Sequence, residues 1–391
     1  MNYEKLLNPT LTDLKPSGIR KFFDIAAEME DVISLSVGEP DFATPWHIRQ
    51  QAIHTLEKGR TWYSPNAGLL PLRQAICGYV ARHNGATYDP KSEVLVTVGG
   101  SEAIDLCMRA LLCPGDEVLI PEPSFVCYDP LTRLAGGVPV PVVTEAKDGF
   151  RLRAEALRAA ITPKTKLLVL PYPNNPTGAI MPREELEAIA EVLRGTDILV
   201  LSDEIYSELT YGREHVSIVS LSGMQERTLL VSGFSKAFAM TGWRLGYVCG
   251  PAPVMKAMTK LHQYAIMCAP TTAQHAAIEA LQHGDEAVQQ MRTEYDLRRR
   301  LIVDGLNKMG LTCFEPEGAF YVFPSVQTTG LSSEEFCRRL LEEKHVAVVP
   351  GNAFGDCGEG FVRVSYCYSL RHITEALNRI RAFLEENELC K

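Results

Sequence analysis

Short apolar runs alternate with helical patterns through the middle of the chain. The runs are rich in valine, leucine and isoleucine and end at turn residues, which is typical of buried strands. A helix is predicted from Gly99 to residue 112, directly after the first run. Such alternation predicts a mostly parallel α/β sheet between helices. We predict its strands at residues 94–98, 118–120, 166–170, 198–201, 228–231 and 245–249.

The two ends of the chain follow a different pattern. A long helical stretch at 272–306, interrupted near Gly284, is followed by strand-like runs alternating with helices, which favours a smaller α+β domain. The helical stretch carries the basic block 298–300, which we predict to lie on a solvated face. Further helices are predicted at 45–57 and 71–83, and further strands at 32–37, 319–323, 346–349 and 361–364. We predict an N-terminal arm with part of the small domain at 1–46, a large domain at 47–290 and a C-terminal small domain at 291–391.

Composition excludes several classes of function. The 391 residues have a formal net charge of -9, which argues against nucleic acid because phosphate backbones need a basic protein face. The N-terminus lacks the regions of a signal peptide, and no uncharged run is long enough to span a membrane, so we expect a cytoplasmic protein. The eleven cysteines include no CxxC pair and the nine histidines no HExxH motif, so we expect reduced thiols and no metal.

One lysine stands where a charge is costly. Lys236 lies between two apolar runs, among small and apolar residues, and a buried amine there favours its neutral form. Lysine amines form Schiff bases with carbonyl compounds. Eight residues later Arg244 offers a planar fork suited to a phosphate group. Taken alone, such a pair is more often a surface lysine and an ion-paired arginine.

Three other strand ends carry polar motifs, and such ends lie at one edge of a parallel sheet. The run to Leu170 is followed by Asn174-Asn175-Pro176-Thr177-Gly178, and the run to Leu201 by Asp203 and Tyr206. The first run leads into the helix start at Gly100 and Ser101, whose free N–H groups suit an anion. Alone, Asn175 could be a turn residue and Asp203 a helix cap.

These motifs, with Arg363-Val364-Ser365-Tyr366 near the end, resemble the class I/II aminotransferases, enzymes of the aspartate aminotransferase fold that use pyridoxal 5'-phosphate (PLP). The resemblance runs from about Ser17 to the last helix. It implies the fold type I architecture, with a mostly parallel seven-stranded sheet in the large domain and a smaller α+β domain.

The resemblance also assigns roles to residues. Lys236 would bind the cofactor aldehyde and then move the substrate proton, Asp203 would pair with the pyridine nitrogen, and Tyr206 would donate to the ring oxygen. We expect the Glu102 side chain to point away from the phosphate while its N–H helps to bind it. Phe125 lies where the family stacks an aromatic ring on the pyridine, although a bare phenylalanine is more often a core residue. The cofactor-binding set is Tyr63, Gly100, Ser101, Glu102, Phe125, Asn175, Asp203, Tyr206, Ser235, Lys236 and Arg244.

The substrate would be an amino acid whose α-carboxylate binds Arg363 as a bidentate pair, beside the backbone of Gly38 and with Ile19 and Asn175 in contact. An arginine paired with a structural carboxylate is the alternative for Arg363. The second substrate would be a 2-oxo acid, 2-oxoglutarate by expectation, in ping-pong kinetics. Tyr63 matches a tyrosine that reaches the partner subunit's phosphate, so the resemblance implies a homodimer with shared sites.

The donor stays open at this stage. Ser101 stands where some bacterial aspartate aminotransferases have a lysine, which favours an aromatic or broad-specificity enzyme over an aspartate one. The motifs at 17–22 and 203–211 resemble Bacillus-type aromatic and N-acetyl-LL-diaminopimelate aminotransferases. A PLP-dependent carbon–sulfur lyase uses the same residues. A transcription regulator with an aminotransferase-like domain would carry a basic winged-helix segment, which the acidic chain does not match.

Overall fold

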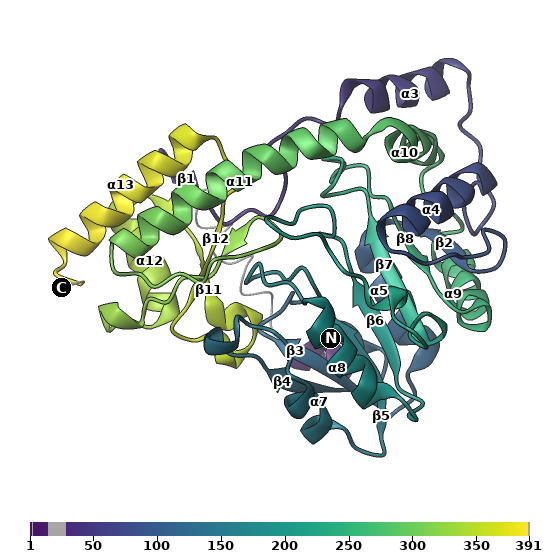
Figure 1. Ribbon diagram of the computed structural model, residues 1–391, viewed down its shortest axis with the longest axis horizontal. Coiled ribbons are helices and arrows are strands. Elements are labelled where there is room, and N and C mark those ends of the chain that lie inside the picture. Colours follow the sequence, from purple (N-terminus) through teal and green to yellow (C-terminus); the bar gives the residue numbers. More distant parts are fainter. Residues whose placement is uncertain (2, 15–28, 390–391) are drawn as a thin grey trace.

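A seven-stranded sheet forms the centre of the computed structural model, which describes residues 1, 3–14 and 29–389 (Figure 1). Its order is β2-β8-β7-β6-β5-β3-β4, and every strand except β8 runs in the same direction. This confirms the predicted mostly parallel sheet. The strands are β2 (Val94–Thr97), β3 (Glu117–Glu122), β4 (Val138–Val143), β5 (Thr165–Leu170), β6 (Leu199–Asp203), β7 (Thr228–Gly233) and β8 (Gly246–Cys249).

Strand β4 is absent from the predicted set because prolines interrupt its apolar residues at positions 139 and 141. A proline cannot donate a hydrogen bond to a neighbouring strand. The structure accommodates both prolines because β4 is an edge strand with β3 as its one neighbour.

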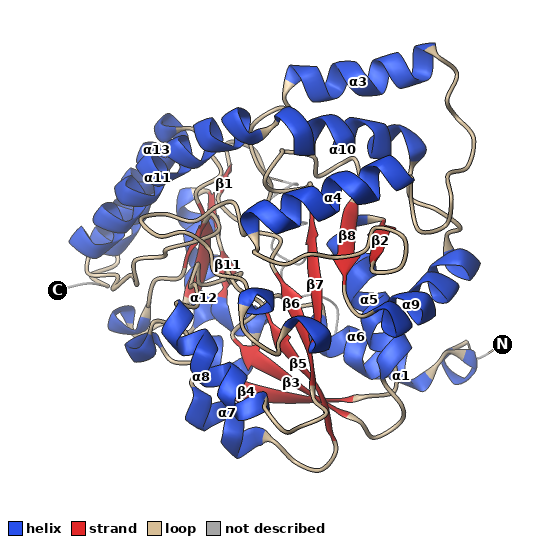
Figure 2. Ribbon diagram, turned by 45° about the vertical axis from the view of Figure 1, so that its right-hand side comes forward, coloured by secondary structure: helices blue, strands red, loops and turns tan. Residues whose placement is uncertain are grey.

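Helices cover both faces of the sheet (Figure 2). Alternate strand residues point to opposite faces: Val118, Val169 and Leu201 pack with α5, α6 and α9, whereas Leu119 and Leu168 pack with α7 and α8. Helices α3, α4 and α10 cover the end of the sheet at β2 and β8. These helices are α3 (Trp46–Glu57), α4 (Leu70–His83), α5 (Gly99–Leu111), α6 (Tyr128–Leu134), α7 (Ala154–Ala160), α8 (Arg183–Leu193), α9 (Ala252–Ala265) and α10 (Thr271–His283).

A second core joins the C-terminal part to a segment near the N-terminus. Strands β11 (Val349–Pro350), β12 (Val362–Ser365) and β9 (Tyr321–Val322) form an antiparallel sheet, and β1 (Ile33–Ser34) pairs with β10 (Val346–Ala347). Strands β1, β9, β10 and β11 are shorter than the predicted runs, whereas β12 has the predicted length and begins one residue later. Helices α11 (Asp285–Lys308), α12 (Ser333–Lys344) and α13 (Leu370–Glu386) pack on them, and α1 (Pro9–Asp13) lies in the N-terminal arm.

Two predictions about α11 have different outcomes. The interruption near Gly284 is confirmed, because α10 ends at His283 and α11 begins at Asp285. The predicted solvated basic block is wrong for two of its three residues: the side chains of Arg298 and Arg299 are only 7% and 9% exposed, and that of Arg300 is 68% exposed. Helix α11 is unbroken at residue 290, where the sequence places the domain boundary, so the division of the domains stays a prediction.

No helix among the residues described here is long and apolar enough to cross a membrane.

Candidate active site

A cavity of about 450 Å³ lies where the carboxyl ends of the parallel strands meet the C-terminal core. Strand ends supply most of its polar side chains, as the sheet topology predicts. Eleven of the predicted site residues line it together: Gly38, Gly100, Ser101, Phe125, Asn175, Asp203, Tyr206, Ser235, Lys236, Arg244 and Arg363.

Lys236 follows β7 and reaches the cavity floor. Its Nζ donates to the backbone carbonyl of Gly38 at 2.6 Å, and its cationic end lies 5.6 Å from the centre of the Phe320 ring. Burial lowers the pKa of Lys236 from its usual value to about 8. A larger share of the amine is therefore neutral and nucleophilic near pH 7 than for an ordinary lysine, in the direction that the apolar flanks of Lys236 predict.

Asp203 ends β6 and is the buried carboxylate of the cavity. Its Oδ2 accepts from the phenol of Tyr128 at 2.7 Å, and its Oδ1 accepts from the amide of Ile205 at 3.2 Å. Burial raises the pKa of Asp203, and the two hydrogen bonds oppose that rise. A cationic partner placed beside this carboxylate would stabilise its ionised form.

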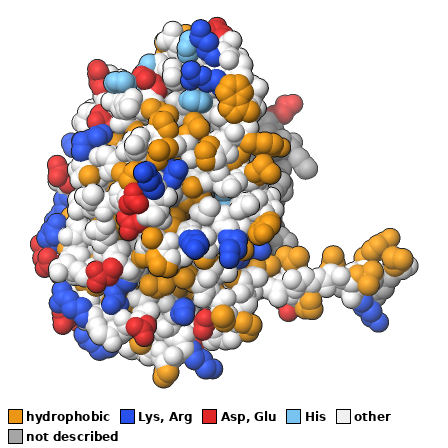
Figure 3. All heavy atoms as spheres, turned by 90° about the vertical axis from the view of Figure 1, so that its right-hand side faces the viewer, with side chains coloured by type: hydrophobic (Ala, Val, Ile, Leu, Met, Phe, Trp, Pro, Cys, Tyr) orange, Lys and Arg blue, Asp and Glu red, His pale blue; other side chains and the backbone are white. Residues whose placement is uncertain are grey.

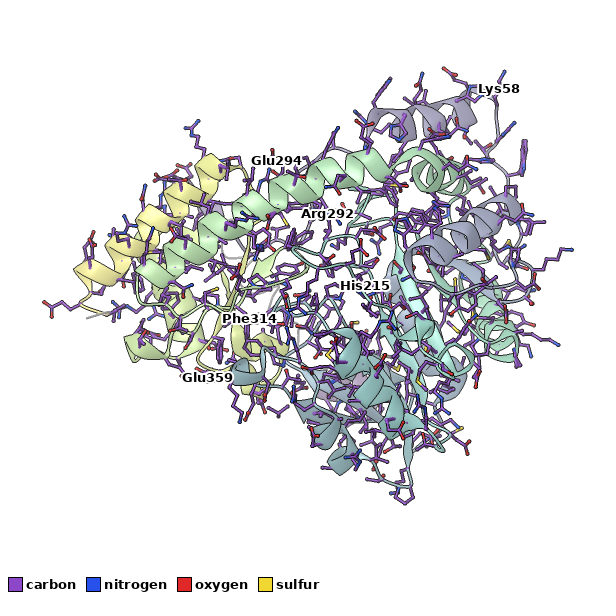
Figure 4. The ribbon with its side chains drawn as sticks, in the orientation of Figure 1. Lys58, His215, Arg292, Glu294, Phe314 and Glu359 are labelled. Atoms are coloured by element: carbon purple, nitrogen blue, oxygen red, sulfur yellow. The ribbon has the colours of Figure 1, made fainter. Side chains whose placement is uncertain are left out.

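The neighbouring acid, Glu204, is fully buried and makes a different set of contacts. Its carboxylate accepts from Ser202, Ser217 and Asn84 and pairs with His215 at 2.6 Å. His215, labelled in Figure 4, lines a second hollow together with Arg292 of α11. Because these partners occupy its oxygens, Glu204 is a structural carboxylate and Asp203 is the one that lines the cavity.

The N-terminus of α5 forms the other end of the cavity. Gly100 and Ser101 line it, and the guanidinium of Arg244 lies so close to Gly99 that a Cβ on that glycine would be 2.7 Å from Nη2. Gly99 also has φ +79°, which disfavours other residues. Free helix N–H groups beside an arginine form a site for a phosphate group.

The Glu102 side chain points away from this anion site, as predicted. Its Oε2 accepts from the amide of Val98 at 2.5 Å, and its Oε1 lies 2.7 Å from Nδ1 of the buried His262. Glu102 is not among the residues that line the cavity.

Arg363 lies on β12 and is 3% exposed. Its Nη1 donates to Oδ1 of Asn175 at 2.9 Å, and its Nη2 donates to the carbonyl of Ser36 at 2.6 Å. The guanidinium packs against the ring of Tyr321, with its carbon 4.6 Å from the ring centre. Its Nε is buried and has no hydrogen-bond partner among the described residues, so one face of the fork remains available to a carboxylate.

Two tyrosines and a glycine close the cavity between the two cores. The hydroxyls of Tyr206 and Tyr321 lie 2.9 Å apart. A Cβ on Gly38 would be 2.1 Å from the Tyr321 hydroxyl oxygen, so this position has no room for a side chain. The Gly38 backbone is thereby held beside both Lys236 and the tyrosine pair.

Phe125 and Tyr63 differ in where they lie relative to the cavity. Phe125 lines the cavity and packs edge-on against Tyr128, with ring centres 6.2 Å apart. Tyr63 is 76% exposed and does not line the cavity of this chain. Ile19 lies outside the described residues.

Sequence reasoning missed Tyr128 and Tyr321. Tyr128 could have been found from its place after β3, because residues after parallel strand ends converge. Tyr321 lies inside a predicted strand, and no local signal separates it from a core residue.

These residues fit PLP. A buried carboxylate suits the pyridine nitrogen, the α5 N-terminus with Arg244 suits the phosphate, and the depressed pKa of Lys236 suits an amine that reacts with an aldehyde. The fold and this site define a PLP-dependent enzyme of fold type I.

Comparison with known proteins places the chain within one family of that class. The family model for aminotransferase class I and II matches residues 30–380. The putative aminotransferase YugH of Bacillus subtilis is 52% identical over 97% of this chain and 98% of its own length. Aromatic-amino-acid aminotransferase 2 of Thermococcus litoralis is 46% identical over 98% of this chain and 99% of its own length.

Solved structures agree with this. Aspartate aminotransferase from Thermus thermophilus with maleate superposes with a TM-score of 0.93 at 42% identity, over 97% of this chain and 99% of that one. The chain belongs to the class I and II aminotransferases, and it is a PLP-dependent transaminase whose substrates are amino acids and 2-oxo acids.

Proposed function

We propose that the enzyme transfers the amino group of an aromatic amino acid, or of a broad range of amino acids, to 2-oxoglutarate by a ping-pong mechanism. One observation carries the choice of donor. The lysines and arginines among the described residues that line the cavity are Lys236, Arg244 and Arg363, and each has a role near the cofactor or the α-carboxylate. A second carboxylate on the donor would therefore meet no further lysine or arginine among the described cavity residues, whereas the rings of Phe125 and Tyr321 line the cavity.

The chain's own residues then have separate tasks. Bound PLP withdraws electrons from the substrate Cα, and Asp203 stabilises the positive charge on the ring nitrogen that this requires. Arg363 would hold the α-carboxylate and so orient the bonds at Cα relative to the bound cofactor. Lys236, whose pKa is depressed to about 8, takes the proton from Cα as the general base.

Tyr206 and Asn175 are proposed to tune the ring oxygen. Asn175 uses Oδ1 to accept from Arg363, which leaves its Nδ2 as a donor toward the cofactor. The Tyr206 hydroxyl is held by Tyr321. Ser235, which is buried and lines the cavity, would complete the phosphate site with Gly100, Ser101 and the backbone N–H of Glu102.

A donor panel tests the proposal. Purified enzyme is incubated with 2-oxoglutarate and, in turn, phenylalanine, tyrosine, aspartate and N-acetyl-LL-diaminopimelate, and glutamate formation is measured. The kcat/KM for phenylalanine or tyrosine should exceed that for aspartate by about tenfold or more, since each 1.4 kcal/mol of discrimination is a factor of ten. Two relatives make the other donors worth testing: an aspartate aminotransferase of Pyrococcus abyssi, 48% identical, and a probable N-acetyl-LL-diaminopimelate aminotransferase of Bacillus subtilis, 44% identical.

The same assay separates transfer from carbon–sulfur cleavage. Pyruvate and sulfide released from a sulfur amino acid, with no glutamate formed from any donor, would contradict the proposed reaction.

We also propose a homodimer with shared active sites. Large apolar side chains are exposed in the N-terminal arm, which projects from the body, and on the face that Figure 3 shows. Exposed patches of this kind mark protein–protein contacts. Those on the arm are Tyr3, Leu6, Leu7 and Leu11, and others near the predicted partner contact Tyr63 are Trp62, Tyr264, Ile266 and Met267. Light scattering after gel filtration should give twice the chain mass of 43.3 kDa, and a monomer mass would overturn this.

A further inference from the structure

Arg298 and Arg299 are buried on α11, although the sequence predicts a solvated basic block. Arg299 pairs with Asp296 and Glu315 and donates to the carbonyl of Pro316. Arg298 faces a different segment: its Nη1 donates to Oδ1 of Asp41 at 2.7 Å. Removing one partner of a buried ion pair is costly, so Asp41 and Arg298 hold their two segments together.

The guanidinium of Arg298 is enclosed by aromatic rings. Its carbon lies 5.1 Å from the centre of the Phe42 ring and 5.5 Å from that of Tyr295, and these two rings meet edge-on at 5.4 Å. Its Nε is buried with no hydrogen-bond partner among the described residues. Asp41 and Phe42 together therefore hold the Arg298 guanidinium of α11 against one short segment of the chain, residues 38–44.

Residues 38–44 connect that anchor to the catalytic lysine. At one end, the Gly38 carbonyl accepts from Lys236. At the other end, Thr44 donates to the carbonyl of Ala239 at 2.6 Å and accepts from Trp243 at 3.0 Å. The segment thus touches the loop that carries Lys236 at both ends and α11 in the middle.

We infer that Arg298 is a positioning residue for the active site: through Asp41 it holds residues 38–44 so that the Gly38 backbone meets Lys236 and the α-carboxylate of the substrate. Arg298 itself does not line the cavity. The inference rests on the proposed role of Gly38 and Arg363 in binding an amino acid. Arg300 supplies a matched control, because it belongs to the same block, is exposed and pairs with Asp296 on its own helix.

The first test needs no turnover. Hydrogen–deuterium exchange is compared for the wild-type protein, Arg298→Met, Asp41→Asn and Arg300→Gln, each loaded with PLP. Peptides that cover residues 38–44 should exchange faster in the first two variants by about threefold or more, and at the wild-type rate in the control, because local opening costs less when an anchor is removed.

The second test measures the consequence for the site. Calorimetric binding of 3-phenylpropionate, an unreactive carboxylate, should weaken by about tenfold in Arg298→Met and Asp41→Asn, equal to about 1.4 kcal/mol, and stay unchanged in Arg300→Gln. KM for the amino donor should rise by a similar factor with kcat changed less. Arg298→Lys should recover part of the affinity, since lysine keeps the charge but not the planar fork.

Unchanged exchange and unchanged carboxylate affinity in Arg298→Met would overturn the inference. Faster exchange spread over α11 and the C-terminal core, with carboxylate affinity retained, would show a purely structural ion pair and would overturn it too. If Arg298→Met does not fold, Asp41→Asn gives the same comparison with a side chain of nearly the same shape. Failure of the proposed function looks different: the variants would still lose carboxylate affinity while the wild-type enzyme transferred no amino group.

Discussion

Replacement of Arg363 by lysine tests the substrate clamp most directly. Arg363 has two donors committed, to Asn175 and to the carbonyl of Ser36, and a buried Nε without a partner among the described residues. A substrate carboxylate can therefore use Nε and share one Nη. Lysine keeps a positive charge but cannot supply two parallel donors, and its single ammonium cannot also hold Asn175 and Ser36.

The size of the effect follows from the bonds that are lost. One hydrogen bond between charged groups contributes about 1.5–3 kcal/mol, which corresponds to a decrease in kcat/KM of about 10- to 150-fold. The decrease should be similar for every amino acid, because each presents the same α-carboxylate. It should appear mainly as a higher KM, since the carboxylate is bound in both the ground state and the transition state.

Steady-state kinetics with an aromatic, an aliphatic and an acidic donor would measure this, with Arg300→Gln as the control for loss of an arginine. Cofactor binding, followed by visible absorption, should be retained in Arg363→Lys. A decrease confined to one class of side chain would refute the reasoning, because Arg363 would then recognise side chains and not the α-carboxylate.

Three further predictions concern other residues. Lys236→Ala should lower turnover by about a thousandfold or more and change the visible absorption of bound PLP, measured by kinetics and spectra; an active alanine variant would contradict a base at this position. Gly38→Ala should raise KM for amino donors by about tenfold, because its Cβ would meet the hydroxyl oxygen of Tyr321 at 2.1 Å, and adding Tyr321→Phe should restore part of the affinity; no gain from the second change would speak against this contact. Burial, with nearby acidic groups, raises the pKa of Glu122 from 4.5 to about 7. Between these pH values the folded state binds more protons than the unfolded state. The contribution of Glu122 to the free energy of unfolding therefore falls as pH rises through 7. The free energy of unfolding of Glu122→Gln, measured with urea relative to the wild type, should therefore be about 1–2 kcal/mol greater at pH 8 than at pH 5. The exposed control Glu184→Gln should show no such change. An equal difference from the wild type at both pH values would refute the prediction.

The sequence by itself determined the strands of the large sheet and which polar motifs follow them along the chain. Apolar runs bounded by turns predict buried strands because unpaired backbone groups are costly inside a protein, and the polar motifs follow those runs at fixed places. The motif after β6, the lysine after β7 and the glycines after β2 could be assigned to one edge from topology alone.

The resemblance chose Asp203 over the adjacent Glu204, and the tertiary structure supplied the physical reason for that choice. Asp203 and Glu204 are adjacent acids, and both fit a strand end in sequence. Successive strand residues point to opposite faces, and only the fold shows that one face holds the cavity and the other holds the serines, Asn84 and His215 that bind Glu204.

The same limit explains Arg298, Tyr128 and Tyr321. Whether an arginine on a helix is solvated depends on what packs against it, and Asp41, its partner here, is 257 residues away along the chain. Tyr128 and Tyr321 act through contacts with Asp203 and Tyr206 that likewise join distant segments. Local patterns report periodicity and turn chemistry, whereas the partner of a buried polar group is set by long-range packing.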